Sequence, residues 1–504
     1  MTGRTTATRT TQAPEAPEAP GVPQSPDAPD APDASEVSEV SETSGVSANA
    51  QPGAATDAGP NLAADAEPNP LADAEPNPTA DAKPNPLADA EPNPTADAEP
   101  NPVTGAEPNP PADAGPNPTA GSPRAEVCTS AEEFAALGPE WDRLHGRCTP
   151  ATPFQSHAWL HAWWGAYGAP RYPRGLRVIL LRAADATLVG AAALLRTGGP
   201  VPALVPLGGA ISDFSDVLLD DAWAERAAPV LAEALAQAAG GALIDFPEVR
   251  PGAAVERVYA CWPGPRRSLP ASVCLELPAV PMDELVARLP SSRGQRVRAN
   301  LRKTAALGLE RRAVPPEEVP GALRVLLDLH RTQWQGRGRK VTAEHLRPRF
   351  AAHLEQAVGA MAGRGEAAVT EFRLDGEVAA VDLTLVAPRL TGGYLYGADP
   401  RLRERKVDVT TMLLHSGTLH LADRPASSGS GRSGAPGAPG VLSMLRGDEP
   451  HKYHWRPERV VSRRLLLARG RGGVLLGAVA CGAAGRGVAK EVLRARRSRT
   501  GAPA

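Results

Sequence analysis

Residues 367–386 have the sequence AAVTEFRLDGEVAAVDLTLV. The runs Ala367–Leu374 and Glu377–Val386 are rich in apolar and β-branched residues, and Asp375-Gly376 lies between them. Two residues that tolerate a positive φ, placed between two such runs, are the strongest short signal for a β-hairpin. The stretch therefore predicts two antiparallel strands joined by a tight turn.

The elements on either side of this hairpin follow from residue spacing. Before it, apolar residues at helical spacing predict helices over 281–289, 293–307 and 321–335, and Thr342 begins a fourth helix that ends near residue 362. After it we predict a strand, a helix, a Ser-, Gly- and Pro-rich loop and two closing strands, over 392–397, 409–421, 425–440, 441–445 and 463–467.

The preceding part of the chain shows the same order of elements. Ser130 and Glu133 form a capping-box pattern before a helix, and a second helix is predicted over 156–167. Strands, a helix and a closing strand follow over 176–182, 188–196, 216–219, 222–239 and 242–246. We therefore predict an α/β (α+β) fold built from two copies of one unit, each a mixed sheet flanked by helices, joined near residues 265–278.

The first 123 residues differ from the rest in composition. They hold no aromatic residue, repeat an Ala-Glu-Pro-Asn-Pro motif every eight residues, and carry three basic side chains against twenty acidic ones, a net charge of −17. The whole chain carries −3, so the remainder carries +14. Such a segment cannot bury enough apolar surface to fold, so we predict a disordered leader over 1–124, domains over 125–270 and 271–470, and a basic tail over 471–504.

Cysteine usage and hydropathy suggest a compartment. The five cysteines are scattered and include no CxxC pair, which predicts neither a disulfide framework nor a metal site. The N-terminus lacks an apolar signal core, and no run of eighteen apolar residues occurs. We expect a cytoplasmic protein. The C-terminal tail, with its arginines and the apolar residues Val488 and Val492, could contact a membrane surface, and a frayed tail is the simpler alternative.

An ordered series of motifs resembles a known family. The series comprises Phe154-Gln155-Ser156-His157-Ala158-Trp159, Asp213-Phe214-Ser215-Asp216, the arginine-rich stretch 293–308, His330 with Trp334 and Gly338, the hairpin, Tyr394 to Pro400, and Gly447 with Lys452 and Trp455. It is similar to the CelD/BcsL-type (BioF-like) acyltransferases of the GNAT superfamily, which are related to FemAB-like double-GNAT proteins. The resemblance covers residues 125–468 and implies tandem GNAT domains.

The resemblance also implies an acyl-CoA co-substrate, an amine or hydroxyl acceptor, and a link to cell-envelope or polysaccharide biosynthesis. One segment departs from the family pattern. After Asp399-Pro400 the family has a small-residue turn before a helix, where the donor's phosphates would meet backbone N–H groups. Here residues 401–409 contain no glycine. A helix N-terminus still attracts phosphate, and Arg405 and Lys406 are the candidate cofactor-binding residues.

Three residues are candidates for catalysis. Asp382, in the predicted hairpin, could be a general base, and a solvent-exposed face is the alternative. Tyr396 could donate a proton to the leaving thiolate. His330 could take a proton from the acceptor, with Trp334 on the same helix face walling the pocket, and a packed interior pair is the alternative.

The remaining candidates would bind substrate: Asp213, Asp216, Arg293, Arg296, Tyr394, Lys452 and Trp455, besides Trp334. The basic helix that contains Arg293 and Arg296 could hold a phosphorylated donor or anionic lipid, or the acidic leader could fold back on it. Turn formation, core packing and solvent exposure are the alternatives for individual members.

These residues predict transfer of an acyl group from a thioester to an amine or hydroxyl, without a metal. Two alternatives stay open. A FemAB-like transferase would use aminoacyl-tRNA, whereas no specific nucleic-acid partner is expected for the acyl-CoA enzyme because no recognised nucleic-acid motif accompanies the basic residues. A non-catalytic module would have kept the fold and lost the donor site, which the glycine-free segment favours.

Overall fold

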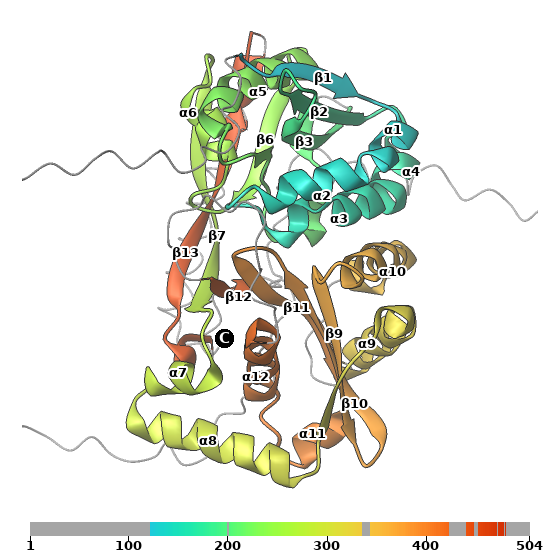
Figure 1. Cartoon of the computed structure of the whole chain (residues 1–504), viewed down its shortest axis with the longest axis vertical. Helices are drawn as coiled ribbons and strands as arrows, with labels where there is room; N and C mark the ends of the chain where they lie inside the picture. Colours follow the sequence, from blue (N-terminus) through green and yellow to red (C-terminus); the bar gives the residue numbers. More distant parts are fainter. Residues whose placement is uncertain are drawn as a thin grey trace, which may run out of the picture. The chain divides into compact units, whose positions relative to one another are not determined.

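The computed structural model describes residues 121–198, 201–334, 343–422, 440–447, 452–470, 472–477 and 479. Its strands form one 13-stranded sheet in the order β1-β2-β3-β4-β6-β13-β7-β12-β11-β10-β9-β8, with β5 paired to β3 (Figure 1). The fold class is confirmed as a mixed α/β sheet flanked by helices. The two predicted sheets are parts of one continuous sheet.

The first half contains the following elements, where η marks a short 3-10 or π turn. They are β1 (Arg124–Cys128), α1 (Ala131–Ala136), α2 (Gly138–Gly146), η2 (Pro153–Gln155), α3 (His157–Trp163), η3 (Trp164–Gly168), α4 (Ala169–Arg171), β2 (Leu176–Arg182), β3 (Leu188–Arg196), β4 (Ala203–Pro206), η4 (Gly209–Ile211), β5 (Leu218–Leu219), α5 (Ala224–Ala239), β6 (Leu243–Val249) and α6 (Val255–Ala260).

The second half begins with a long strand. Its elements are β7 (Arg266–Pro278), α7 (Met282–Ala287), α8 (Ser291–Ala306), β8 (Glu310–Ala313), η5 (Pro316–Glu318), α9 (Val319–Trp334), η6 (Ala343–Leu346), α10 (Pro348–Ala362), β9 (Ala367–Leu374), β10 (Glu377–Val386), β11 (Leu390–Ala398), α11 (Pro400–Glu404), α12 (Val409–Ala422), β12 (Val441–Arg446), η7 (Lys452–Trp455) and β13 (Glu458–Leu467).

The two halves repeat one strand topology and exchange their last strands. In each half four consecutive ladder strands are antiparallel, β1 to β4 and β8 to β11. The fourth strand then pairs in parallel with a fifth, β4 with β6 and β11 with β12. The sixth strand crosses over: β7 pairs with β12, and β13 pairs with β6. β7 and β13 also pair with each other and join the halves (Figure 1).

The strongest local signals are confirmed at residue level. Glu377 pairs with Leu374 across the Asp375-Gly376 turn, and both turn residues have positive φ, 54° and 83°. Ser130 accepts a hydrogen bond from the Glu133 N–H at the start of α1. The predicted helix start at Thr342 lies outside the described residues, and α10 begins at Pro348.

The segment predicted to join the halves is itself a central strand. β7 holds Pro270 and several polar residues, so only its final residues show a strand pattern in the sequence. The ladder with β13 is irregular between Val461 and Arg463, opposite Pro270, which accommodates a residue without an N–H. The boundary predicted at residue 270 lies within this strand, and the division into two domains stays a prediction.

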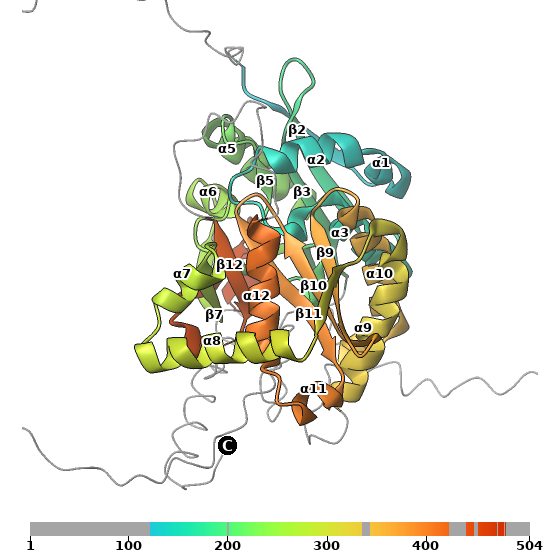
Figure 2. The same ribbon diagram turned by 60° about the horizontal axis from the view of Figure 1, so that its bottom comes forward.

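Helices cover both faces of the second-half strands. On one face α9 and α10 bury Leu323, Leu326 and Leu354 against Val381 and Leu383 of β10. α10 also packs against α3 of the first half. On the other face lie α7, α8 and α12, and α8 crosses α12 near the start of α12 (Figure 2).

Gly397 sets the approach of α9 to β11. A Cβ at this position would lie 2.5 Å from the Leu326 carbonyl oxygen and 2.6 Å from the His330 nitrogen. These are backbone atoms of α9, which cannot move aside as a flexible side chain can. The helix and the strand are therefore in direct backbone contact, and the residues of α9 that follow are fixed against the end of β11.

We expect Gly397→Ala to lower the free energy of unfolding by about 1–3 kcal/mol, because the added methyl group forces α9 away from β11. Urea unfolding followed by circular dichroism measures it. The matched control is Gly321→Ala in α9, where nothing lies within 4 Å of an added Cβ. That change should raise the stability slightly, by about 0.5–1 kcal/mol, because alanine favours helix. Equal effects of the two substitutions would contradict the contact.

Candidate active site

The end of β11 directs backbone groups away from its antiparallel partner. The parallel ladder with β12 covers only Leu390–Gly392, although β11 continues to Ala398. His330 Nδ1 lies 2.8 Å from the Tyr396 carbonyl oxygen, and the Ala398 N–H donates to Gln333 Oε1 at 3.0 Å. In an antiparallel ladder the N–H and C=O of one residue point to the same side. Both backbone groups of Tyr396 therefore face the edge that β12 has left.

Two side chains of α9 hold this edge in place. The His330 Nδ1–H donates to the Tyr396 carbonyl, which leaves Nε2 as acceptor toward His345 Nδ1 at 3.3 Å. Gln333 Nε2 donates to the Tyr396 hydroxyl at 2.9 Å, while its Oε1 accepts from Ala398. Burial lowers the pKa of His330, so the imidazole is neutral at pH 7. Sequence reasoning named His330 and Tyr396 as separate catalytic candidates and did not predict this contact.

Gln333 was missed by sequence reasoning. The only signal for it is its spacing, three residues after His330 on one helix, which places both on the same face. Trp334, predicted on this face, is the last residue of α9, and its side chain lies outside the described residues.

Asp382 of β10 lies directly opposite Tyr396 and is 1 % exposed, so the alternative of a solvent-exposed face is wrong. Thr384 Oγ1 donates to its Oδ2 at 2.9 Å, while Oδ1 has no hydrogen-bond partner among the described residues. Burial raises the pKa of Asp382 to about 7, against the lowering effects of the Thr384 hydrogen bond and the Arg311 charge. The carboxyl group therefore titrates near neutral pH.

A polar layer separates the second-half strands from α12. Arg311 of β8 donates to Ser416 Oγ at 3.1 Å and contacts His420 at 3.3 Å. Thr370 Oγ1 lies 2.9 Å from His420 Nε2. Thr370 is also the β9 partner of Asp382. Asp382 is thus linked to this layer by its strand pairing with Thr370 and by the charge of Arg311.

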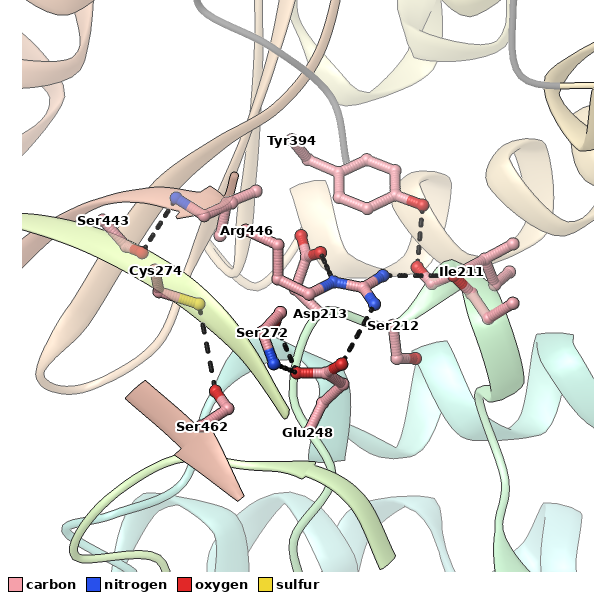
Figure 3. Close-up of polar contacts among 12 residues, drawn as sticks. Ile211, Ser212, Asp213, Glu248, Ser272, Cys274, Tyr394, Ser443, Arg446 and Ser462 are labelled. Atoms are coloured by element: carbon pink, nitrogen blue, oxygen red, sulfur yellow. Dashed lines mark hydrogen bonds and ion pairs between the residues drawn. The ribbon is translucent and has the colours of Figure 1, made fainter. Parts of the chain in front are cut away.

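A second polar cluster lies where the two halves meet (Figure 3). Arg446 Nε donates to Asp213 Oδ1 at 2.5 Å and its Nη2 to the Ala210 carbonyl at 3.3 Å, while Nη1 lies 3.8 Å from Glu248 Oε1. Asp213 is 1 % exposed, and its Oδ2 has no hydrogen-bond partner among the described residues. The Tyr394 hydroxyl donates to the Ile211 carbonyl at 2.9 Å. Two predicted substrate-binding residues, Asp213 and Tyr394, therefore meet at this junction.

Both fifth strands are strained beside the cluster. Glu248 in β6 has φ 53° and Leu445 in β12 has φ 55°, values that non-glycine residues rarely adopt. Each lies where a ladder loses its register, opposite β13 and β7 respectively. Such strain persists only where the surroundings impose it and is frequent at functional sites. The same kind of strained residue therefore occurs in both halves. Glu248 is itself a member of the cluster, and Leu445 directly precedes Arg446, another member.

A groove of about 760 Å³ runs along the β7–β13 ladder. Arg250 and Glu276, joined by two hydrogen bonds of 2.8 and 2.6 Å, are part of its lining, and Arg459 and Arg463 are exposed in it. Glu276 follows Cys274 by two residues, so both lie on the face of β7 that turns toward the junction.

Three predicted substrate-binding residues have structural roles instead. Asp216 accepts hydrogen bonds from the Ala254 and Val255 N–H groups at the start of α6. The ammonium group of Lys452 is fully buried and donates to the carbonyls of Met444 and Arg446, both at 3.1 Å. Trp455 is buried among Leu275, Leu414 and their neighbours. Hydrogen bonds within the fold therefore account for the positions of Asp216 and Lys452, and packing accounts for that of Trp455.

The candidate donor site at α12 is occupied by a carboxylate of the chain itself. Asp408 accepts from the Thr411 N–H at 3.1 Å and its hydroxyl at 2.8 Å, and from Asn300 of α8 at 2.9 Å. Arg405 lies 3.5 Å from Asp375, and the Lys406 carbonyl accepts from Lys303. Arg293 and Arg296 lie on α8, away from the junction cluster. The roles of these four basic residues stay predictions.

The described residues contain no group of three His, Cys, Asp or Glu side chains that could hold a metal ion. Four of the five cysteines are described, and all four are free thiols. In the part of the chain that the structure covers, every helix is too short or too polar to cross a bilayer.

We expect Asp382→Asn to raise the free energy of unfolding at pH 8. The folded protein keeps the Asp382 proton up to pH about 7, whereas the unfolded chain releases it near the ordinary pKa of 3.8. The wild type therefore loses stability from this group as the pH rises through that interval, by up to about 4 kcal/mol. Asparagine stays neutral, so the advantage of the variant should shrink as the pH falls toward 4.

Urea titrations between pH 4 and 8 test this difference. Asp216, whose pKa burial also raises to about 7, titrates in both proteins and cancels in the comparison. The exposed Asp185, whose pKa hydrogen bonding with Thr187 lowers, provides the control, because Asp185→Asn should not stabilise at pH 8. A variant less stable than wild type at pH 8 would contradict a buried, uncompensated charge.

Residues 291–453 match the family model described as "Acetyltransferase (GNAT) domain". Solved structures similar to the chain include FemX (11% identity, TM-score 0.47, 68% of this chain and 97% of that one) and L-PGS from Bacillus licheniformis (12%, 0.41, 68% and 93%). A tandem GNAT protein from the clavulanic acid biosynthesis pathway is also similar (14%, 0.34, 69% and 99%).

No curated protein sequence matches the chain. The matched segment contains α8 to β12 and therefore the β11 edge, Asp382 and α12. Residues 291–453 are thus similar to a GNAT acetyltransferase domain, and this match supports an acyltransferase.

Proposed function

We propose that the protein transfers an acyl group from a thioester such as acyl-CoA to an amine or hydroxyl acceptor at the edge of β11. The observation that carries this proposal is the direction of the Tyr396 backbone groups, away from β10 and beyond the end of the β12 ladder. A backbone N–H fixed at a strand edge can stabilise the oxyanion that forms on a thioester carbonyl. The Ala398 N–H, two residues on, is held by Gln333.

In the proposed reaction the acceptor nitrogen or oxygen attacks the thioester carbon. The carbonyl oxygen gains negative charge beside the Tyr396 N–H, and the C–S bond breaks as the tetrahedral species collapses. Asp382, whose pKa of about 7 lets it exist as carboxylate at neutral pH, takes the proton of the acceptor. The Tyr396 hydroxyl, held by Gln333, returns a proton to the leaving thiolate.

His330 has a positioning role in this scheme. Its Nδ1–H is committed to the Tyr396 carbonyl and its Nε2 faces His345, so it orients the strand edge and does not accept the acceptor's proton. This revises the role predicted from sequence. The groove beside the junction, with Arg250, Glu276 and Arg463 in its lining, suits a polar acceptor that reaches the site from the first half.

One observation favours a second candidate. The carboxylate of Asp408 occupies the N-terminus of α12, the position where the family resemblance places the donor phosphates, and would repel them. An aminoacyl-tRNA donor, which brings its acyl ester without a diphosphate at that position, avoids this conflict. It would transfer an aminoacyl group with the same oxyanion site.

We expect the full-length protein to release free thiol from acetyl-CoA or longer acyl-CoAs when a panel of amines and amino sugars is supplied. Thiol release is followed with a chromogenic disulfide, and acylated product is identified by mass spectrometry. Transfer from aminoacyl-tRNA with no thiol release would favour the second candidate. If no product forms and calorimetry detects no binding of either donor, the result would support a non-catalytic module and end the proposal.

We expect Gln333→Ala to lower kcat by about 10- to 100-fold with a smaller change in KM. The substitution removes two hydrogen bonds, one that holds the Tyr396 hydroxyl, the proposed proton donor, and one that fixes the Ala398 N–H beside the proposed oxyanion site. Steady-state thiol-release kinetics measures the effect, with Gln237→Ala as the matched control because Gln237 is exposed on α5. Unchanged kcat in Gln333→Ala would contradict the placement of the site at the β11 edge.

A further inference from the structure

α8 carries positive charges and no negative ones. Its ionisable side chains are Arg293, Arg296, Arg298, Arg302 and Lys303. Arg293 is half-buried, and the other four are exposed. Among the residues that the structure describes, no ion pair involves any of these five side chains. Lys303 donates a hydrogen bond to the Lys406 carbonyl at 3.1 Å, which brings no negative charge to it. α8 therefore displays positive charges that lack an ion-pair partner in the described fold.

The outward side of α8 is uncharged and lies between two basic flanks. Gly294 and Val297 are buried, and Val297 belongs to the same apolar cluster as Leu414 of α12, so these residues define the inward side. With about 3.6 residues per turn, the opposite side carries the exposed residues Ser292, Gln295, Ala299 and Ala306. The four exposed basic residues then form the two flanks, Arg296 with Lys303 and Arg298 with Arg302.

Neighbouring segments extend the positive charge beyond both ends of α8. Exposed Lys406 lies beside the last turn, because its carbonyl accepts the Lys303 hydrogen bond. Arg288 lies shortly before α8 and Arg456 directly after η7, and both are exposed. Each of these two guanidinium groups donates to the carbonyl of the other residue, at 3.3 and 3.2 Å. The exposed acidic residues of the adjoining helices α7 and α11 are Asp283, Glu284 and Glu404.

These charges are too widely spread for a single small anion. α8 has 16 residues and is therefore about 24 Å long. A small ligand is contacted from several directions at once in a concave pocket, whereas the side chains on the two flanks of a convex helix diverge. A partner that meets all of them must present many negative groups over the length of the helix. An anionic lipid surface and a nucleic acid both have this property.

Two features of α8 favour the lipid surface. The helix contains no aromatic side chain, whereas single-stranded nucleic acids are bound largely through stacking of bases on aromatic rings. The uncharged outer row lets the helix lie flat on a plane, and long arginine side chains on both flanks can extend to headgroups on either side. Lipids also move laterally within a membrane, so their headgroups need not match the spacing of the arginines. Clusters of about four to eight basic residues on one helix are typical of binding to anionic headgroups.

We propose that α8 docks the protein on a membrane surface rich in anionic lipid, with the helix axis parallel to the membrane plane. The outer row holds no large apolar side chain, so the attachment is electrostatic and salt weakens it. Asn300 of α8 donates to Asp408 before α12, so docking brings this end of α12 close to the lipid (Figure 2). The inference requires only the charges of α8 and does not depend on the reaction proposed for the β11 edge.

Sedimentation with lipid vesicles tests the docking. The full-length protein is mixed with vesicles of phosphatidylcholine, either alone or with about 30 mol% phosphatidylglycerol, at about 50 mM salt. The bound fraction gives a partition coefficient, which we expect to be at least about 10-fold higher for the anionic vesicles. Raising the salt to about 500 mM should remove most of this difference, because the Debye length then falls to about 4 Å.

Matched variants locate the contact on α8. Arg296→Gln, Arg298→Gln and Arg302→Gln together should lower the partition coefficient for anionic vesicles at least about 10-fold. The corresponding three lysine substitutions keep the charge and should retain most of the binding. The control replaces three exposed arginines elsewhere, Arg171, Arg174 and Arg267, by glutamine and should not change the partition coefficient. Circular dichroism verifies that each variant is folded.

Lys303 reports on the docked face directly. Neither lipid carries a primary amine, so an acetyl N-hydroxysuccinimide ester labels only amines of the protein. Acetylation of Lys303, followed by mass spectrometry, should be at least about 3-fold slower with anionic vesicles than with phosphatidylcholine vesicles. The C-terminal tail is also basic, and a variant in which glutamine replaces its last four arginines should retain this protection of Lys303. These arginines are Arg494, Arg496, Arg497 and Arg499.

Any of three results contradicts the proposal. The first is equal binding to anionic and phosphatidylcholine vesicles. The second is binding that the glutamine variant of α8 keeps and the glutamine variant of the tail loses, because the tail is then the anchor. The third is slower labelling of Lys303 with transfer RNA but not with anionic vesicles, which assigns α8 to a nucleic-acid partner.

Discussion

The antiparallel ladder between β7 and β13 is the contact through which each half of the sheet is completed by the other. β6 and β12 would each end their half with an open edge, and the strand that closes each one comes from the opposite half. Open edges are unfavourable because their backbone groups lack partners. The exchange resolves this for both halves at once, and it fixes β6 and β12 on either side of one central pair.

This arrangement brings the junction cluster together. Arg446 lies on β12, Glu248 on β6, and Asp213 on the loop before β5, and none of these elements is adjacent in sequence. The strained residues Glu248 and Leu445 occur at the ladder irregularities of the two fifth strands, so the twofold repeat of topology also repeats the strain. α9 fixes the second region of interest, because its contact with Gly397 leaves no freedom between helix and strand.

Local signals in the sequence predicted local structure well. The Asp375-Gly376 turn and the Ser130 cap involve residues within a few positions of one another, so their chemistry is readable from the chain alone. Contacts over long separations were not readable. Arg446 and Asp213 are 233 residues apart, and no periodicity relates them. Gln333 is an ordinary polar residue on a helix until the end of β11 is placed beside it.

The charge of a side chain was a misleading guide to its exposure for some residues, because the contacts that bury it come from distant parts of the chain. Lysine normally stays in water, and Lys452 was predicted either to bind substrate or to lie exposed at the surface. Its ammonium group instead satisfies two carbonyls at the end of β12, which the sequence does not show to be without strand partners. Asp382 gave the opposite case, since the alternation of β10 was consistent with an exposed face, whereas the folded chain buries the carboxyl group beside the Thr384 hydroxyl.

The exchanged strands have a consequence for biosynthesis. Asp245 of β6 and Arg464 of β13 are 219 residues apart, so the ribosome completes nearly all of the second half before the first half can close. During that interval β6 and β7 are exposed to solvent and to neighbouring nascent chains, and unpaired strand edges are sites of misassembly. Translation of β13 is thus the event that protects the edge of the first half, and folding of the first half is coupled to it.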